Sequence, residues 1–319
     1  MYERILVPLD GSELARQALP YAGAIAAARS VYVELVEVVA PLEALIKPPT
    51  EDEFAAVGAG VGAYPWPASD EWAGVAERFR EEAVKRLAEA ESLVGGGTAT
   101  RSVVLDGDPA TAIIKEADKQ PGTLIVMATH GRSGIGRWLL GSVTDKVVRH
   151  AHHPTLVVRA RDDVDGTVGT IGEVILPLDG SSISEAAVPH AVEMSKILGV
   201  GISLVRTVSP ASHADAFAEY MPDGYAQMVE EAREDAEEYL EGMATRIRDQ
   251  GVSPVRTEAS IGNASSMIVD RARAAQKPLV VMATHGRSGL GRWVLGSVAD
   301  RVVRHGPGPV LVVRPDEAS

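Results

Sequence analysis

The sequence predicts an α/β fold made of two tandem doubly wound domains. The chain has 319 residues, which suits two domains of about 150 residues each. The 23 residues from 128 to 150 recur at 283–305 with 19 identities. Short apolar runs also alternate with segments of helical spacing, which predicts in each half a five-stranded parallel sheet with helices on both faces.

The elements of the first half follow in order from the spacing of its apolar residues. The run RILVPL at 4–9 predicts a buried strand, and residues 12–28 carry apolar side chains at helical spacing. A charged amphipathic pattern predicts a long helix over 70–93, and the apolar TLIVMAT predicts a buried strand over 123–129. The remaining strands are expected at 31–39, 100–105 and 155–158, and the remaining helices at 109–117 and 143–150.

The duplication also sets the expected domain boundaries. The segment ILVPLDGS at 5–12 is matched by VILPLDGS at 174–181, and the first half is 14 residues longer than the second. The additional length falls between Pro41 and Trp72, where proline, glycine and acidic residues predict an exposed, mobile insertion. We expect one domain over 1–160, a linker over 161–170 and a second domain over 171–319.

Composition narrows the class of protein. The chain is 45% hydrophobic and 24% charged, which is typical of a globular protein, and its first residues lack a cationic segment followed by a long apolar run. With no cysteine and no stretch as long as a membrane span, a cytoplasmic protein without a membrane segment is expected. The net charge of −13 argues against nucleic acid and anionic membranes as partners.

The repeated loop has the features of a phosphate site. It follows an apolar strand, contains three glycines, and ends at Gly141 and Ser142, where a helix is expected to begin. Glycines allow close backbone approach, and a helix N-terminus offers N–H donors and a partial positive charge. Arg132 and Arg137 add positive charge that the second repeat reproduces. Nearby Lys146 and Arg149 have a simpler role available, which is to complement a helix C-terminus.

Two common phosphate loops do not fit this segment. A Walker A loop ends in Gly-Lys-Ser/Thr, whereas Gly141-Ser142 has no lysine beside it. The dinucleotide fingerprint follows the first strand and needs a third glycine, whereas this loop follows the fourth strand and has Leu139 at that place.

The loop instead resembles that of the ATP-binding branch of the universal stress protein family, G-x2-G-x9-G-S/T. Gly131 and Gly141 are separated by nine residues and followed by Ser142, and the second repeat has the same spacing. Asp10 and Asp179, each in Pro-Leu-Asp-Gly-Ser, match the aspartate that follows the first strand in this family. The chain departs from the pattern at the family's first glycine, which is alanine in both repeats. The chain is identified as a tandem member of this family.

The resemblance implies a strand order of 3-2-1-4-5, and a ligand is expected where that order reverses. It implies that Asp10 and Asp179 contact the adenosine, that main chain near Val38 and Thr207 meets the adenine edge, and that Met127 and Met282 line its pocket. The implied nucleotide-binding set of the first repeat is Pro8, Asp10, Val38, Gly107, Met127, Ala128, Gly131, Arg132, Gly134, Gly141, Ser142 and Val143. The set of the second repeat is Pro177, Asp179, Thr207, Gly262, Met282, Ala283, Gly286, Arg287, Gly289, Gly296, Ser297 and Val298.

The resemblance implies a regulator that binds ATP, with or without Mg²⁺, at one site per repeat. Two alternatives stay open: a slow ATPase or nucleotidyl transferase, and a dimerising scaffold with a vestigial pocket. His130 and His285 lie on the loops, but no partner spacing supports a catalytic triad, so no catalytic residue is assigned. No metal ligands are assigned, because the second repeat keeps only His305 of the cluster at 150–153. Asp10 has the alternative role of capping the first helix.

The last strand of each repeat predicts how the halves assemble. Residues 155–158 (TLVV) and 310–313 (VLVV) are short, apolar and β-branched, so each is an edge that needs a partner. In the family this strand pairs across a two-fold axis between subunits. We therefore expect the two strands to pair antiparallel within one chain, as an internal pseudo-dimer, with any homodimer using other surfaces. The alternative is pairing between chains in a swapped dimer.

Overall fold

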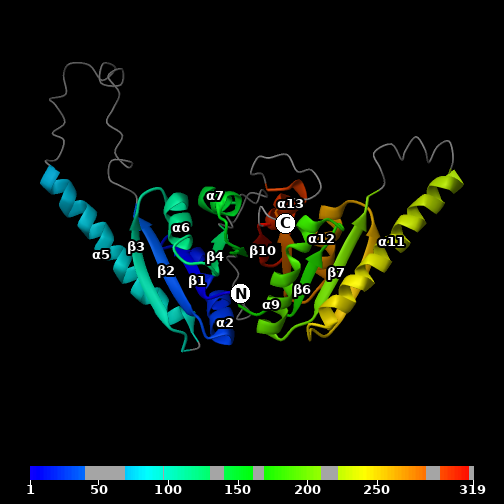
Figure 1. Ribbon diagram of the computed structural model, residues 1–319. Coiled ribbons are helices and arrows are strands. Elements are labelled where there is room, and N and C mark those ends of the chain that lie inside the picture. Colours follow the sequence, from blue (N-terminus) through cyan, green and yellow to red (C-terminus); the bar gives the residue numbers. More distant parts are fainter. Residues whose placement is uncertain are drawn as a thin grey trace, which may run out of the picture.

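The computed structural model describes residues 1–39, 69–95, 97–129, 140–160, 169–209, 222–284 and 295–315. Its first half contains alternating strands and helices (Figure 1). In chain order these are β1 (Arg4–Leu9), α1 (Glu13–Arg16), α2 (Leu19–Arg29), β2 (Tyr32–Val39), α5 (Ser69–Val94), β3 (Thr100–Asp106), α6 (Pro109–Ala117), β4 (Thr123–Thr129), α7 (Ser142–His150) and β5 (Thr155–Arg159).

The second half repeats this order, as expected. Its elements are β6 (Glu173–Pro177), α8 (Ser182–Glu185), α9 (Val188–Leu198), β7 (Ile202–Val208), α11 (Pro222–Arg248), β8 (Val255–Ile261), α12 (Ala264–Ala274), β9 (Pro278–Ala283), α13 (Ser297–His305) and β10 (Val310–Val313). The predicted insertion and linker lie largely outside the described residues, although α5 begins at Ser69, within the predicted insertion. The domain boundaries therefore remain predictions.

One helix prediction is wrong. The segment 12–28 forms two helices, because α1 ends at Arg16 and α2 begins at Leu19. A proline ring in a helix clashes with the carbonyl four residues earlier, and Arg16 lies four residues before Pro20. In the second half α8 ends at Glu185, again four residues before a proline.

The strands form one ten-stranded sheet in the order β3-β2-β1-β4-β5-β10-β9-β6-β7-β8. Each half has the predicted order 3-2-1-4-5, and every pairing within a half is parallel. The first strand of each half therefore lies between its second and fourth strands. Their carboxyl ends meet at one edge, where the order reverses.

The halves join through an antiparallel pairing of β5 with β10. Leu156 lies opposite Leu311, and Val157 lies opposite Val310. Beside the strands, the Arg159 guanidinium donates to the main-chain oxygen of Gly306 at 2.7 Å. This confirms the predicted pairing of the two strands within one chain.

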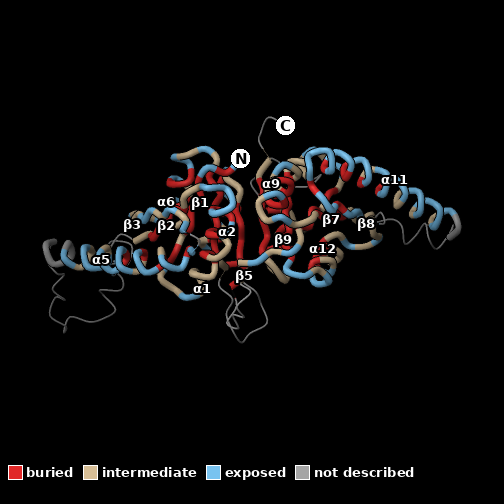
Figure 2. The backbone as a smooth tube through the Cα atoms, turned by 90° about the horizontal axis from the view of Figure 1, so that it is seen from below, coloured by how far each residue is buried: buried red, intermediate tan, exposed pale blue. Residues whose placement is uncertain are grey.

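Helices cover both faces of the sheet, and the buried residues concentrate between the layers (Figure 2). On one face, α2, α5, α9 and α11 pack on a core that continues through both halves. On the other face, α6 and α7 cover the first half, and α12 and α13 cover the second. The aliphatic strands expected from the sequence thus form the centre of the molecule.

A buried ion pair has opposite polarity in the two halves. Arg4 on β1 donates to Glu34 Oε2 at 2.7 Å and to the main-chain oxygen of Glu116 on α6 at 2.8 Å, and it lies 3.9 Å from the Glu116 carboxylate. At the corresponding places of the second half, Glu173 on β6 accepts from Arg271 on α12 at 2.8 Å. The first pair is more deeply buried, because the Arg4 and Glu34 side chains are 3% and 1% exposed.

The strand junction predicts the effect of proline at its centre. Val157→Pro with Val310→Pro removes the two N–H donors that face each other across the junction, and we expect the halves to move apart without unfolding. The radius of gyration from small-angle scattering should rise, while circular dichroism retains the α/β spectrum. Val157→Ala with Val310→Ala is the control, since it keeps both N–H groups. An unchanged radius in the proline variant would contradict the junction.

The two ion pairs predict unequal losses of unfolding free energy when the arginine of each is replaced by methionine. Arg4→Met leaves the buried Glu34 carboxylate without its main partner, which should lower the free energy of unfolding by about 3–5 kcal/mol. Arg271→Met should cost clearly less, because Glu173 is more exposed and keeps Arg256 at 3.4 Å. Urea denaturation of the two variants compares these costs. Equal losses would show that burial is not what separates the two pairs.

Candidate functional site

A cavity lies at the carboxyl edge of the second half, where β6 and β9 end side by side. Its volume is about 340 Å³, which is at the lower end of small-molecule sites. It is lined by Pro177, Leu178, Asp179, Ser184, Val205, Thr207, Ala264, Ile268, Met282, Ala283, Thr284, Gly296, Ser297, Val298 and Ala299. The lining therefore combines apolar side chains with residues from the beginning of α13.

The cavity brings together most of the predicted residues of the second repeat. Among the described ones only Gly262 is not part of its lining, although it makes the turn that follows β8. Sequence reasoning missed Val205 and Ile268, which form the apolar wall. Val205 could have been predicted from the sequence, because it lies two residues before Thr207 and therefore on the same face of the strand.

The aspartate after the first strand is held by a tight turn. Asp179 Oδ1 accepts from the Ser181 N–H at 2.9 Å and from its hydroxyl at 2.6 Å. Gly180 between them has φ +84°, a conformation that favours glycine. Ser181 in turn accepts from the Ser184 N–H at 3.1 Å and is the N-cap of α8. The serine thus performs the capping, and the aspartate is positioned at the cavity.

The first repeat has the same turn. Asp10 Oδ1 accepts from the N–H of Ser12 at 3.0 Å and from its hydroxyl at 2.6 Å. Ser12 accepts from the Ala15 N–H at 3.1 Å and caps α1. The alternative role of Asp10 as the helix cap is therefore wrong.

The helices after the glycine loops begin without a side-chain cap. Gly141 and Gly296 are the N-cap residues of α7 and α13, and among the described residues neither helix receives a capping hydrogen bond from a side chain. The Gly296 N–H donates to the Thr284 oxygen at 2.7 Å, which holds the beginning of α13 against the end of β9. The first-turn N–H groups of α13 therefore lie at the cavity, in the arrangement that favours an anion.

The remaining first-repeat candidates occupy the same places as their counterparts. Pro8 lies in β1, Val38 in β2, Met127 and Ala128 in β4, while Gly141, Ser142 and Val143 form the beginning of α7. Gly107 has φ +125° and its N–H donates to the Val39 oxygen at 3.2 Å, as the Gly262 N–H does to Val208 at 2.9 Å. The structure thus brings the described candidates of each repeat to one edge.

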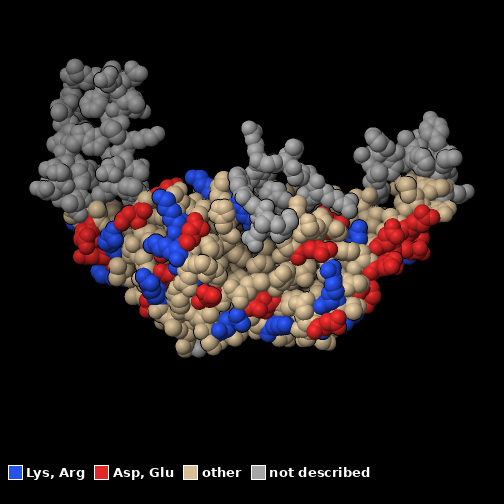
Figure 3. Space-filling view, viewed as in Figure 1, with Lys and Arg blue, Asp and Glu red and all other residues tan. Residues whose placement is uncertain are grey.

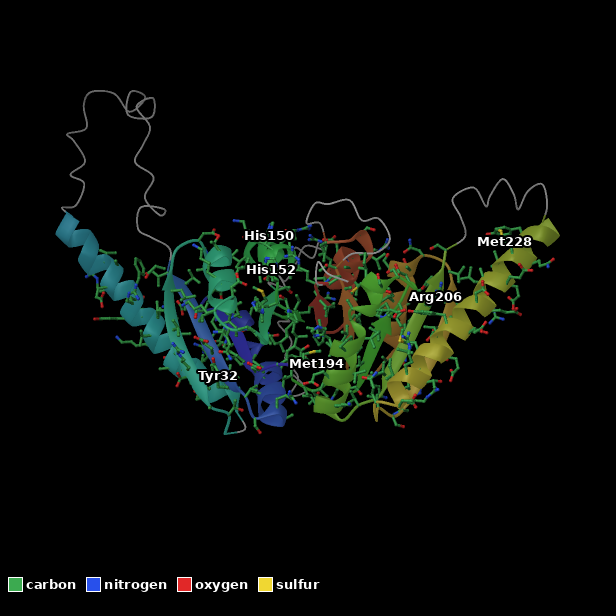
Figure 4. The ribbon with its side chains drawn as sticks, viewed as in Figure 1. Tyr32, His150, His152, Met194, Arg206 and Met228 are labelled. Atoms are coloured by element: carbon green, nitrogen blue, oxygen red, sulfur yellow. The ribbon has the colours of Figure 1, made fainter. Side chains whose placement is uncertain are left out.

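A guanidinium lies beside each Asp-Gly-Ser turn, but it comes from a different element in each half. In the first half Arg86 of α5 is hydrogen-bonded to Glu37, which raises the pKa of Arg86. In the second half Arg206 of β7, which is labelled in Figure 4, stacks on the Tyr239 ring at 4.7 Å. A side chain at Gly11 would meet Arg86, and one at Gly180 would approach Arg206.

The histidines near α7 differ in their surroundings. His150 and His152 are exposed and labelled at the end of α7 in Figure 4, whereas His153 lies 3.2 Å from Asp118. Burial lowers the pKa of His153, although Asp118 opposes that shift. Within the described ranges no three His, Asp or Glu side chains are gathered as metal ligands.

Part of the predicted site lies outside the described residues. This holds for Gly131, Arg132, Gly134, Gly286, Arg287 and Gly289, and for the loop histidines His130 and His285.

Charge is distributed unevenly over the surface. Acidic side chains gather along α11, where Glu230, Glu234 and Glu238 are exposed (Figure 3). This acidic run is a solvated helix face, packed on its other side by Leu240 and Ala236. None of the helices described here is long and apolar enough to cross a bilayer.

Comparison with known proteins places both halves in one family. A sequence model of the universal stress protein family matches residues 1–159 and 171–314. A universal stress protein of Mycolicibacterium smegmatis is 26% identical over 321 residues, covering 98% of this chain and 97% of that protein. Another, from Methanocaldococcus jannaschii, is 32% identical over 162 residues, covering 50% of this chain and 83% of that protein.

A solved structure has the same fold over both halves. The crystal structure of a universal stress protein from Archaeoglobus fulgidus covers 98% of this chain and 99% of its own, with a TM-score of 0.66 and 20% identity. The duplicated motifs, the strand order and the match to both halves agree. The chain belongs to the universal stress protein family, with one family domain in each half.

Proposed function

We propose that this protein is a regulator that binds ATP or a related adenine nucleotide at one site in each repeat. Nucleotide occupancy changes its conformation or its partners in response to stress. ATP binds alone or with Mg²⁺, and the protein acts in the cytoplasm, as the sequence predicts.

One observation carries the proposal. The cavity of the second half contains a carboxylate at one side, an uncapped helix N-terminus at another and an apolar wall between strands and α12. These three surfaces suit the three parts of a nucleotide, because hydroxyls of a sugar donate to a carboxylate and phosphates accept from N–H groups. An apolar wall suits the faces of a base.

The residues then take distinct roles. Asp179 accepts from the ribose hydroxyls, and the base packs against Met282 and Ile268. The N–H groups of the first turn of α13 and the Ser297 hydroxyl hold phosphate oxygens. In the first repeat Asp10, Met127 and Ser142 take these roles.

The glycine loops predict how binding is lost. Gly131→Val with Gly286→Val should abolish ATP binding, because a branched side chain blocks the close approach of the backbone to phosphate. Either substitution alone should leave one ATP per chain, as measured by isothermal titration calorimetry.

Gly242→Val is the matched control, since a side chain there meets nothing within 4 Å. It should retain two ATP per chain. Unchanged affinity in the double loop variant would overturn the assignment of these loops to phosphate.

A regulator and an enzyme differ in turnover. We expect ATP hydrolysis far below the enzyme median of about 10 per second, with bound nucleotide recovered mostly intact after denaturation. Chromatography of the released nucleotide measures this. A rate near that median, lost in Asp10→Ala with Asp179→Ala, would instead establish an ATPase.

A further inference from the structure

Four charged side chains form a ring between the two repeats, where α7 and α13 lie next to each other (Figure 1). Arg149 Nε lies 2.8 Å from Asp145 on its own helix, and Arg304 Nε lies 2.9 Å from Asp300 on its own helix. Each arginine also reaches across the interface. Arg149 is 3.6 Å from Asp300, and Arg304 is 3.6 Å from Asp145. We call these four residues the charge ring.

Two members of the charge ring lie in the first turns of the helices that begin at the candidate phosphate sites. Asp145 is in the first turn of α7, where its N–H donates to the Gly141 oxygen at 2.8 Å. Asp300 holds the same place in α13, with its N–H donating to Gly296 at 2.8 Å. The arginines come from the last turns of the two helices. Each helix N-terminus is therefore linked to the C-terminal turn of the other repeat's helix.

A carboxylate in the first turn works against an anionic ligand. It stabilises the helix itself, but its negative charge repels a phosphate at the same N-terminus. Side chains of the ring are only 25–31% exposed, so water screens their charges incompletely. Asp300 Oδ1 is buried and accepts no hydrogen bond within the described residues, and Arg149 reaches it across the interface at 3.6 Å.

We propose that Arg304 is a positioning residue for the nucleotide site of the first repeat, and that Arg149 has this role for the second. Each arginine neutralises and holds the first-turn aspartate of the other repeat. A phosphate at either helix N-terminus interacts with the same four charges. Binding of nucleotide at one site therefore changes the affinity of the other site. This inference rests on the proposed nucleotide binding.

The test uses the full chain with Gly286→Val, in which only the first repeat binds ATP. Adding Arg304→Met changes no residue of the first repeat. We expect ATP affinity at the first site to fall about fivefold or more, the lower end of couplings between sites. Arg304→Lys should restore most of the affinity, because it restores the charge. At 1 M KCl the difference should shrink, since charges at this exposure are then screened.

Arg314→Met is the matched control. The Arg314 guanidinium also crosses the interface and donates to the main-chain oxygens of His150 and Ala151 at 3.3 Å, but it is not part of the charge ring. Its loss should leave ATP affinity at the first site unchanged. In the chain with both loops intact, Arg304→Met should weaken both sites, whereas a role confined to its own helix would weaken one.

The outcomes separate the two proposals. If the Gly286→Val chain binds one ATP and Arg304→Met leaves its affinity unchanged, the charge ring has no role and the nucleotide sites stand. An equal loss in Arg314→Met would assign the effect to general loosening of the interface and would also overturn the inference. If the chain with intact loops binds no ATP, both proposals fail.

Discussion

The antiparallel pairing of β5 with β10 is the interaction on which the rest of the molecule depends. Without it, each half would end in a short apolar strand such as Thr155–Arg159, exposed along its length. With it, Leu156 and Leu311 become fully buried, and the core on one face of the sheet becomes continuous through both halves. The two repeats are thus joined by an interface within one chain.

This pairing also determines where the two sites lie relative to each other. It places β4 and β9 on either side of the central strands, so α7 and α13, which follow them, meet at the interface. Each helix begins at a candidate phosphate site and ends at the contact with the other repeat. A helix of nine residues therefore connects each site with the interface.

The repeated sequence predicted most of the fold, because the spacing of apolar residues and the alternation of strands with helices can be recognised in the sequence alone. The boundaries of β1, β4 and α6 and the central strand pairing agree with the expectations. The prediction of one helix over 12–28 is wrong. The spacing of apolar residues contains no information about the clash between the Pro20 ring and the carbonyl of Arg16. A prediction that ends the helix four residues before Pro20 would have found the break.

The candidate site was predictable only in part. Asp179 and Ser297 belong to motifs that carry their own chemistry, so they can be recognised in isolation. Ile268 and Val205 are ordinary core residues in the sequence, and only the packing of α12 on β7 makes them a cavity wall. The charge ring was equally hidden. Arg149 was expected to complement a helix C-terminus, and its contact with Asp300 depends on the arrangement of the two repeats.

Differences between the repeats matter because a strand of one half could otherwise pack against the corresponding helix of the other half. Arg4 faces Glu116 in the first half, whereas Glu173 faces Arg271 in the second. If β1 packed beneath α12, Arg4 would meet Arg271, and β6 beneath α6 would bring Glu173 to Glu116. Like charges in a buried place are costly, so each first strand is compatible only with the helix of its own half. The inverted ion pairs therefore distinguish the two halves, whereas the repeated loop sequences do not.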